Sequence, residues 1–297
     1  MTEIEPDSRH YESAGLRLHY LVWGDESNPP LLLVHGGRDN ARIWDALAGR
    51  LAGRHAVYVP DLRGHGDSDW APSSEYAIAD FVADLAALLL IIARDREPAG
   101  RIGLIGHSRG GGIALRLAGT YPECFRRVVA IDGMGRNVRW HEPAPNRLRG
   151  WIERRHESDT WRPRVYPSLE AAIDRVEQGN PRFGPELARH LAIHGTRAVD
   201  DGVVWKFDPR VRFHPVFDFP DDEIRQFFGA IDAPVLLIRG DESDRGERDQ
   251  NVWATSFSDA KSIILPGVGH WVQHERPDEL LALIAEFLAE PTPVAGD

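Results

Sequence analysis

Short apolar runs recur along the chain, and most of them show no alternation of apolar and polar positions. These runs lie at residues 30–35, 56–61, 101–105, 127–132, 234–240 and 262–266. A continuous apolar run of this length is typical of a parallel strand that is covered on both faces. Residues 18–23 alternate instead and end at a Gly-Asp pair, which predicts an edge strand.

Helical spacing fills the gaps between these runs. Residues 79–93 carry apolar side chains on one helical stripe, and residues 277–290 do the same near the end of the chain. A further helical pattern follows residue 110. Strand and helix therefore alternate, which favours an α/β fold with a mostly parallel sheet and helices on both of its faces.

The alternation stops in the middle of the chain. Residues 135–230 are rich in Arg, Pro, Trp and Phe and contain no clear buried strand. Within them, residues 169–176 and 186–193 predict helices, and Ser168 stands where the first of these needs an N-cap. The predicted division is a core of residues 1–134 and 231–297 and a helical insertion of residues 135–230.

Residues 106–110, Gly-His-Ser-Arg-Gly, stand between an apolar run and a helical pattern. Gly-x-Ser-x-Gly in that context is the signature of a nucleophile elbow, a turn so sharp that its flanking positions hold almost no side chain. The turn presents the Ser108 hydroxyl at the carboxyl end of its strand. Ser108 is therefore the candidate nucleophile.

A serine hydroxyl needs a neighbouring base to attack a carbonyl near neutral pH. His270 follows the last predicted strand in a glycine-rich loop, and the carboxyl ends of parallel strands converge on one crevice. The chain order Ser, Asp, His also matches hydrolases that use such an elbow, so His270 is the expected base. His274 is the alternative, whereas the side chain of His107 is expected to point away from the Ser108 hydroxyl.

The base in turn needs a carboxylate that fixes its tautomer. Residues 241–244, Asp-Glu-Ser-Asp, follow the apolar run at 234–240. We choose Asp244, because Asp241 lies right at the strand end, where it is better placed to brace the loop. Asp132 follows a different strand end that faces the same crevice, and it stays open as the alternative.

Two backbone N–H groups must face the negative charge that develops on the substrate oxygen. One is expected from Arg109, directly after the nucleophile, and the other from Gly37, with Arg38 as the alternative. Residues 61–69 hold several Asp and His side chains, but their spacing does not give the closed ligand set of a zinc site. A hydrogen-bonded turn is expected there.

Together these motifs resemble the α/β-hydrolase superfamily, and within it bacterial esterases and serine hydrolase-like proteins. The resemblance rests on residues 35–37, 61–68, 106–111, 240–244 and 269–270. It implies an α/β-hydrolase fold with an eight-stranded sheet, a Ser-His-Asp triad, a helical cap formed by the insertion, and no cofactor or metal. Serine at the elbow argues against the haloalkane dehalogenases and epoxide hydrolases of this fold, which need Asp there.

The expected activity is hydrolysis of carboxylic esters of small to medium, largely apolar substrates through an acyl-enzyme on Ser108. Aromatic residues are frequent in the insertion, which favours an apolar roof over the pocket. The candidate substrate-binding residues are Arg38, Trp44, Trp140 and Trp271. The side chain of Arg109 is expected to pair with a loop carboxylate.

Several alternatives stay open. The same triad is compatible with cleavage of a lactone or a carbon–carbon bond, or with acyl transfer to a nucleophile other than water. An alternative of another class is a ligand-binding or signalling protein that retains the triad with very slow turnover. Substrate screening, product analysis and turnover measurements would separate these functions.

Charge and composition narrow the expected partners. A net charge of −11 without a basic stripe argues against nucleic acid. A single cysteine, Cys124, and an N-terminus without a signal-peptide pattern favour the cytoplasm. The longest apolar run, residues 85–93, is too short to span a bilayer. Basic residues that are almost all arginine suggest a bacterial source, and a monomer or homodimer is expected.

Overall fold

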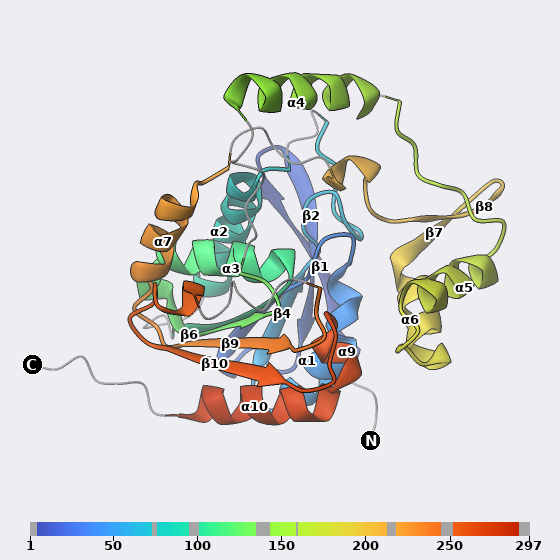
Figure 1. Ribbon diagram of the computed structural model, residues 1–297. Coiled ribbons are helices and arrows are strands. Elements are labelled where there is room, and N and C mark those ends of the chain that lie inside the picture. Colours follow the sequence, from blue (N-terminus) through green and yellow to red (C-terminus); the bar gives the residue numbers. More distant parts are fainter. Residues whose placement is uncertain are drawn as a thin grey trace, which may run out of the picture.

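The computed structural model describes residues 5–72, 76–94, 101–134, 143–158, 160–212, 218–244 and 252–290. Its centre is an eight-stranded sheet in the order β1-β2-β4-β3-β5-β6-β9-β10 (Figure 1). The strands are β1 (Asp7–Ser13), β2 (Leu16–Trp23), β3 (Pro30–Val34), β4 (Ala56–Pro60), β5 (Ile102–His107), β6 (Phe125–Ile131), β9 (Val235–Gly240) and β10 (Ala260–Leu265). All neighbouring pairs are parallel except β1 with β2 and β2 with β4. This confirms the predicted mostly parallel sheet.

Helices cover both faces of the sheet. Three of them, α2 (Ile78–Arg94), α3 (Arg109–Thr120) and α7 (Asp221–Gly229), contribute to one apolar cluster. Helices α1 (Asp45–Leu51) and α10 (Pro277–Ala289) contribute to a second cluster on the opposite face. Strand β3 supplies both, with Leu32 in the first and Leu31 and Leu33 in the second. Burial on both faces explains why its sequence is apolar without alternation.

The edge of the sheet differs from the prediction. Residues 18–23 lie in β2, which pairs with β1 on one side and with β4 on the other, so the expectation of an edge strand there is wrong. Strand β1 forms the edge, and most of its side chains are exposed or half-buried. An exposed polar strand gives little apolar signal, which is why the sequence pattern did not reveal it.

The insertion combines helices with a short hairpin. Helix α4 (Ala144–Ser158) lies at one end of the molecule, and α5 (Leu169–Gly179) and α6 (Pro185–Gly195) stand beside the core (Figure 1). The helices predicted at 169–176 and 186–193 are thus confirmed, and the Ser168 side chain accepts a hydrogen bond from the Ala171 amide as an N-cap. Strands β7 (Thr196–Val199) and β8 (Gly202–Trp205) form an antiparallel hairpin that was not predicted.

The middle and the end of the insertion have different surroundings. Helices α5 and α6 share a small apolar cluster of their own, which includes Ile173 and Ala188. Helix α7 instead packs on α3, and its Ile224 and Phe228 lie in the first core cluster. By packing, we therefore assign α7 to the core and keep the name cap for the elements from α4 to β8.

Short helical turns complete the described chain. They are the 3₁₀ helices Ala41–Trp44, Pro122–Cys124 and Pro209–Arg212, and the four-residue helix α9 (Val272–Glu275). Within the described ranges, every helix is too short or too polar to cross a membrane.

Candidate active site

The nucleophile elbow forms where β5 ends and α3 begins. Ser108 has φ 54° and ψ −121° and directly precedes the first residue of α3. Neighbouring backbone comes so close that a Cβ on Gly106 would lie 2.3 Å from the Gly110 carbonyl oxygen. A Cβ on Gly110 would likewise lie 2.4 Å from the carbonyl oxygen of His35. Only glycine fits these two positions, as the sequence predicted.

The structure brings the predicted base to the predicted nucleophile. His270 lies in the loop between β10 and α9, and its Nε2 is 3.0 Å from Ser108 Oγ. The His270 side chain is only 14% exposed, so protein surrounds most of the imidazole. This distance suits the transfer of a proton from the hydroxyl to the ring.

The carboxylate that meets His270 is Asp132. Its Oδ2 accepts a short hydrogen bond from His270 Nδ1, and Ser243 Oγ donates to the same oxygen at 2.5 Å. Asp132 follows β6 with a positive φ of 44°, and its amide donates to the Ile238 carbonyl at 2.7 Å. Two hydrogen bonds thus hold the carboxylate, and a third holds the Asp132 backbone at the end of β6.

The expectation that Asp244 pairs with His270 is therefore wrong. Strand β6 is the direct neighbour of β5, whereas Asp244 follows β9, one strand further along the sheet. Asp244 is exposed, and the serine before it, Ser243, is the residue that contacts Asp132. Both aspartates give the chain order Ser, Asp, His, so that order could not distinguish them.

Glu275 stabilises the loop that carries His270. Its carboxylate accepts hydrogen bonds from the Gly269 amide at 2.9 Å and from the Trp271 amide at 3.4 Å. These two residues flank His270 on either side. Burial works against ionisation of Glu275, but the hydrogen bonds from Arg182 and Gly269 outweigh it and hold its pKa below the usual value. Sequence reasoning did not single out this residue.

His107 supports the same loop from the elbow strand. Its Nε2 donates to the His270 carbonyl oxygen at 2.9 Å, which agrees with the prediction that it does not serve Ser108 as a base. The ring of Trp271 packs on the rings of His107 and His270, with centroid distances of 5.0 and 5.5 Å. Trp271 thus lies beside the site, as expected for a substrate-binding candidate.

The cap reaches the His270 loop through two adjacent residues. Arg182 forms an ion pair with Glu275 at 2.8 Å and a second one with Glu242. The Phe183 ring packs edge-on against Trp271, with ring centroids 5.8 Å apart. The segment between α5 and α6 therefore contacts the residues that hold His270 in place.

The other substrate-binding candidates lie in different surroundings. Trp44 is fully buried in the second core cluster, so the expectation that it contacts substrate is wrong. Its apolar character serves the packing of α1 under the sheet. Trp140 lies outside the described residues. Arg38 is exposed in the loop after β3, with a φ of 71°.

The oxyanion candidates lie on two segments that meet at Ser108. A Cβ on Gly36 would lie 3.2 Å from Ser108 Cβ, and a Cβ on Gly37 would lie 3.3 Å from the Arg109 guanidinium carbon. Arg109 is the first residue of α3, and the first N–H groups of a helix have no acceptor within it. The Arg109 side chain donates to the Val211 carbonyl at 3.0 Å and so ties the elbow to the segment after the hairpin.

The loop after β3 also carries a carboxyl group, that of Asp39. Asp39 Oδ2 is buried and has no hydrogen-bond partner among the described residues. It would lie 2.8 Å from a Cβ on Gly36, the residue that abuts Ser108. Burial raises the pKa of Asp39 from 3.8 to about 7. This group, which the sequence analysis did not identify, changes charge near neutral pH.

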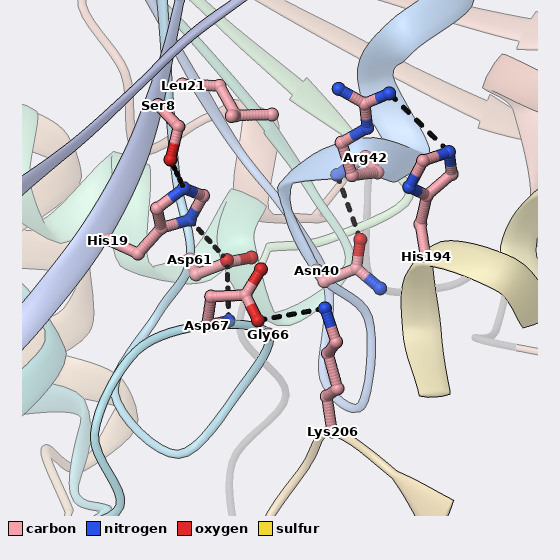
Figure 2. Close-up of a pocket in the computed structure, with 10 residues that line it drawn as sticks. All are labelled: Ser8, His19, Leu21, Asn40, Arg42, Asp61, Gly66, Asp67, His194 and Lys206. Carbon is pink, nitrogen blue, oxygen red and sulfur yellow. Dashed lines mark hydrogen bonds and ion pairs between the residues drawn. The ribbon is translucent and has the colours of Figure 1, made fainter. Parts of the chain in front are cut away.

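A pocket of about 250 Å³ lies between the core and α6 of the cap (Figure 2), and Ser108, Asp132 and His270 are not among its lining residues. It is lined by Ser8, His19, Leu21, Asn40, Arg42, Asp61, Gly66, Asp67, His194 and Lys206. Asp61 accepts hydrogen bonds from His19 Nδ1 at 2.7 Å and from the Ala41 and Asp67 amides at 2.6 and 2.9 Å. Asp61 thus braces the turn, which confirms the predicted hydrogen-bonded structure of this segment.

Comparison with known proteins identifies the family to which this architecture belongs. A family model described as the alpha/beta hydrolase family matches residues 31–283. The chain is 29% identical to the esterase Rv0045c of Mycobacterium tuberculosis, over 90% of this chain and 85% of that protein. It is 26% identical to a serine hydrolase-like protein of Danio rerio, over 92% of this chain and 85% of that protein. The thioesterase domain from the curacin biosynthetic pathway has the same fold, with a TM-score of 0.84, 23% identity, and coverage of 95% of this chain and 99% of that one.

Proposed function

Since this chain belongs to the alpha/beta hydrolase family, we propose that it is a serine hydrolase that cleaves carboxylic esters. The observation that carries the proposal is the continuous contact from Ser108 through His270 to Asp132. A serine esterase needs this order of nucleophile, base and acid. The similarity to an esterase over most of both chains supports the same reaction class.

The first chemical step joins Ser108 Oγ to the carbonyl carbon of the ester. His270 Nε2, 3.0 Å away, accepts the hydroxyl proton as the bond forms. Asp132 holds the imidazole by its Nδ1–H and stabilises the imidazolium. The proton then passes to the leaving alcohol, and the acyl group remains on Ser108.

The backbone amides of Gly37 and Arg109 are the proposed donors to the oxyanion. The close packing of the loop after β3 against Ser108 supports this assignment. In the second step, His270 takes a proton from water, which attacks the acyl-enzyme and releases the acid. Removal of one oxyanion donor typically lowers kcat by roughly 10²–10³, so the shape of this loop matters as much as the triad.

The proposed substrates are small to medium esters with a largely apolar acyl group. Trp271 and Phe183 supply aromatic surface at the boundary between the His270 loop and the cap. Aromatic side chains bind apolar groups with large contact area. Arg38 is exposed on the loop after β3, residues 35–40, which we call the oxyanion loop. It is the proposed contact for a polar part of the substrate.

The test is hydrolysis of p-nitrophenyl acetate, butyrate and octanoate by the wild type, by Ser108→Ala and by Ser27→Ala. Ser27 is an exposed serine and serves as the matched control. We expect turnover of acetate or butyrate in the wild type and in Ser27→Ala, and its loss in Ser108→Ala. Equal turnover in Ser108→Ala would overturn the assignment of the nucleophile, and a maximum at octanoate would overturn the proposed substrate size.

A further inference from the structure

A second group of chemically active side chains lies where the cap meets α1. Asp45, His190 and His194 each offer a ligand atom, and these three atoms lie within 4.8 Å of one another. Asp45 is the first residue of α1, and both histidines belong to the cap helix α6. All three residues are half-buried, so an ion from solution can reach them.

The spacing of the two histidines suits metal binding. Residues four apart on a helix lie on the same face, one turn above the other. The rings of His190 and His194 are accordingly 4.6 Å apart between centroids. Two imidazoles on one helical face form a ready pair of nitrogen ligands, and the helix holds that pair in place before any ion arrives.

The carboxylate completes the set at a suitable distance. His190 Nε2 lies 3.3 Å from Asp45 Oδ2. Two ligands of one tetrahedral zinc ion, each bonded at about 2.0–2.1 Å, are separated by about 3.3–3.4 Å. The second carboxylate oxygen, Asp45 Oδ1, is buried and has no hydrogen-bond partner in the described part of the chain. Asp45 therefore has acceptor capacity that its present contacts do not use.

Arg42 is the group with which an ion must compete. Its Nε lies 2.8 Å from Asp45 Oδ2 and its Nη2 lies 3.5 Å from His194 Nε2. Figure 2 shows the Arg42 guanidinium beside the His194 ring. His190 Nε2 also lies 3.1 Å from the Arg42 carbonyl oxygen. A positive charge already sits among these ligands, and a metal ion would replace it.

We propose that Asp45, His190 and His194 bind a divalent transition-metal ion such as Zn²⁺. Two imidazole nitrogens and one carboxylate oxygen suit this class of ion, with water as the remaining ligand. Mg²⁺ prefers oxygen ligands and is not expected to bind. The bound ion joins α6 of the cap to α1 of the core. Since α1 follows the oxyanion loop in the chain, the ion holds the cap close to that loop.

The test is calorimetric titration of chelator-treated protein with Zn²⁺, and with Mg²⁺ as the comparison ion. We expect one Zn²⁺ site in the wild type that weakens at least about tenfold in His190→Ala and in His194→Ala. His156→Ala, which removes an exposed histidine of α4, is the matched control and should bind like the wild type. Arg42→Gln should bind Zn²⁺ more tightly, because the competing charge is gone.

Thermal unfolding with and without Zn²⁺ provides the second readout, since a ligand that binds only the folded state raises Tm. His190→Gln and His194→Gln keep a polar side chain of similar size and show whether a loss of binding reflects a loss of folding. Folded variants that bind Zn²⁺ as tightly as the wild type would overturn the proposal. Equal binding of Mg²⁺ and Zn²⁺, or weaker binding in Arg42→Gln, would overturn it as well.

Discussion

The end of the sheet and the cap are held in place by different kinds of contact. Around Ser108, backbone packs directly on backbone, as at Gly106 and at Gly133, where a Cβ would lie 1.9 Å from the Ser108 carbonyl oxygen. The cap meets the core through side chains, some of them charged and some apolar. These contacts include the ion pairs of Arg182 with Glu275 and of His190 with Asp45. Just after the cap, Lys206 pairs with Asp67, and Tyr76 donates a hydrogen bond to Asp208.

The difference follows from where the molecule needs to be rigid. A reacting oxygen and nitrogen 3.0 Å apart must keep that separation, and close-packed backbone leaves little room for movement. Ion pairs between exposed side chains, such as Arg182–Glu242, are weak and are screened by salt, so they hold the cap less firmly than backbone packing holds the elbow.

The largest effect is expected at the acid. Asp132→Asn removes the charge that orients His270 and stabilises its protonated form, and we expect kcat to fall by roughly 10³–10⁴. Asp244→Asn is the matched control and should keep nearly full activity. Steady-state kinetics on a p-nitrophenyl ester measures both, and a large loss in Asp244→Asn with none in Asp132→Asn would reverse the assignment.

The next effect concerns the backbone packing. Gly106→Ala places a Cβ 2.3 Å from the Gly110 carbonyl oxygen, so the elbow must deform. We expect the free energy of unfolding to fall by about 3 kcal/mol and ester hydrolysis to be lost. A Cβ on Gly53 would have no neighbour within 4 Å, so Gly53→Ala is the control in chemical denaturation. Similar stabilities of the two variants would contradict the claim that close backbone packing holds the elbow in place.

A smaller effect follows from the buried carboxyl group of Asp39. With its pKa raised from 3.8 to about 7, folded protein keeps a proton that the unfolded chain has already lost between these values. Stability therefore falls as pH rises through this window and levels off above it. We expect Asp39→Asn to be more stable than the wild type by roughly 1–3 kcal/mol at about pH 8.5, and by less at about pH 5.

Chemical denaturation at the two pH values measures this difference. Asp174→Asn, at an exposed position on α5, controls for the loss of a negative charge. If the gain in Asp39→Asn were the same at both pH values, burial of this carboxylate would not be its cause.

The smallest effect is expected in the cap. Arg182→Ala removes the ion pairs with Glu275 and Glu242, so the His270 loop keeps only the packing of Phe183 as its described contact with the segment between α5 and α6. We expect kcat/KM to fall a few-fold. About 1 M NaCl should lower the wild-type value in the same direction and leave the variant nearly unchanged, because salt screens an ion pair whose partners are exposed, as in Arg182–Glu242. An equal salt response in both proteins would show that these pairs do not hold the cap.

The sequence predicted much of the core, because buried strands and the elbow leave strong local patterns. Ser108 and His270 were found by motif and chain order, and the structure brings them into contact. The choice between Asp132 and Asp244 depends on which strand lies next to β5, and strand order is a long-range property that no local pattern contains. Similarly, Trp44 follows the oxyanion loop in sequence yet points into the core.

Two other features lay beyond sequence patterns for a different reason. Glu275 acts on His270 through the amides of Gly269 and Trp271, six and four residues away, and nothing in the local sequence marks such a glutamate apart from any other. The hairpin of β7 and β8 consists of two four-residue strands with mostly half-exposed side chains. Strands that short are too brief for an alternating pattern to emerge.

The position of the cap along the chain has a practical consequence for redesign. Asp132 comes before the cap elements, and the chain has rejoined the core by α7. Ser108, Asp132 and His270 thus all lie outside the stretch from α4 to β8. That stretch can be replaced by another of different length without altering a codon of the three proposed reacting groups.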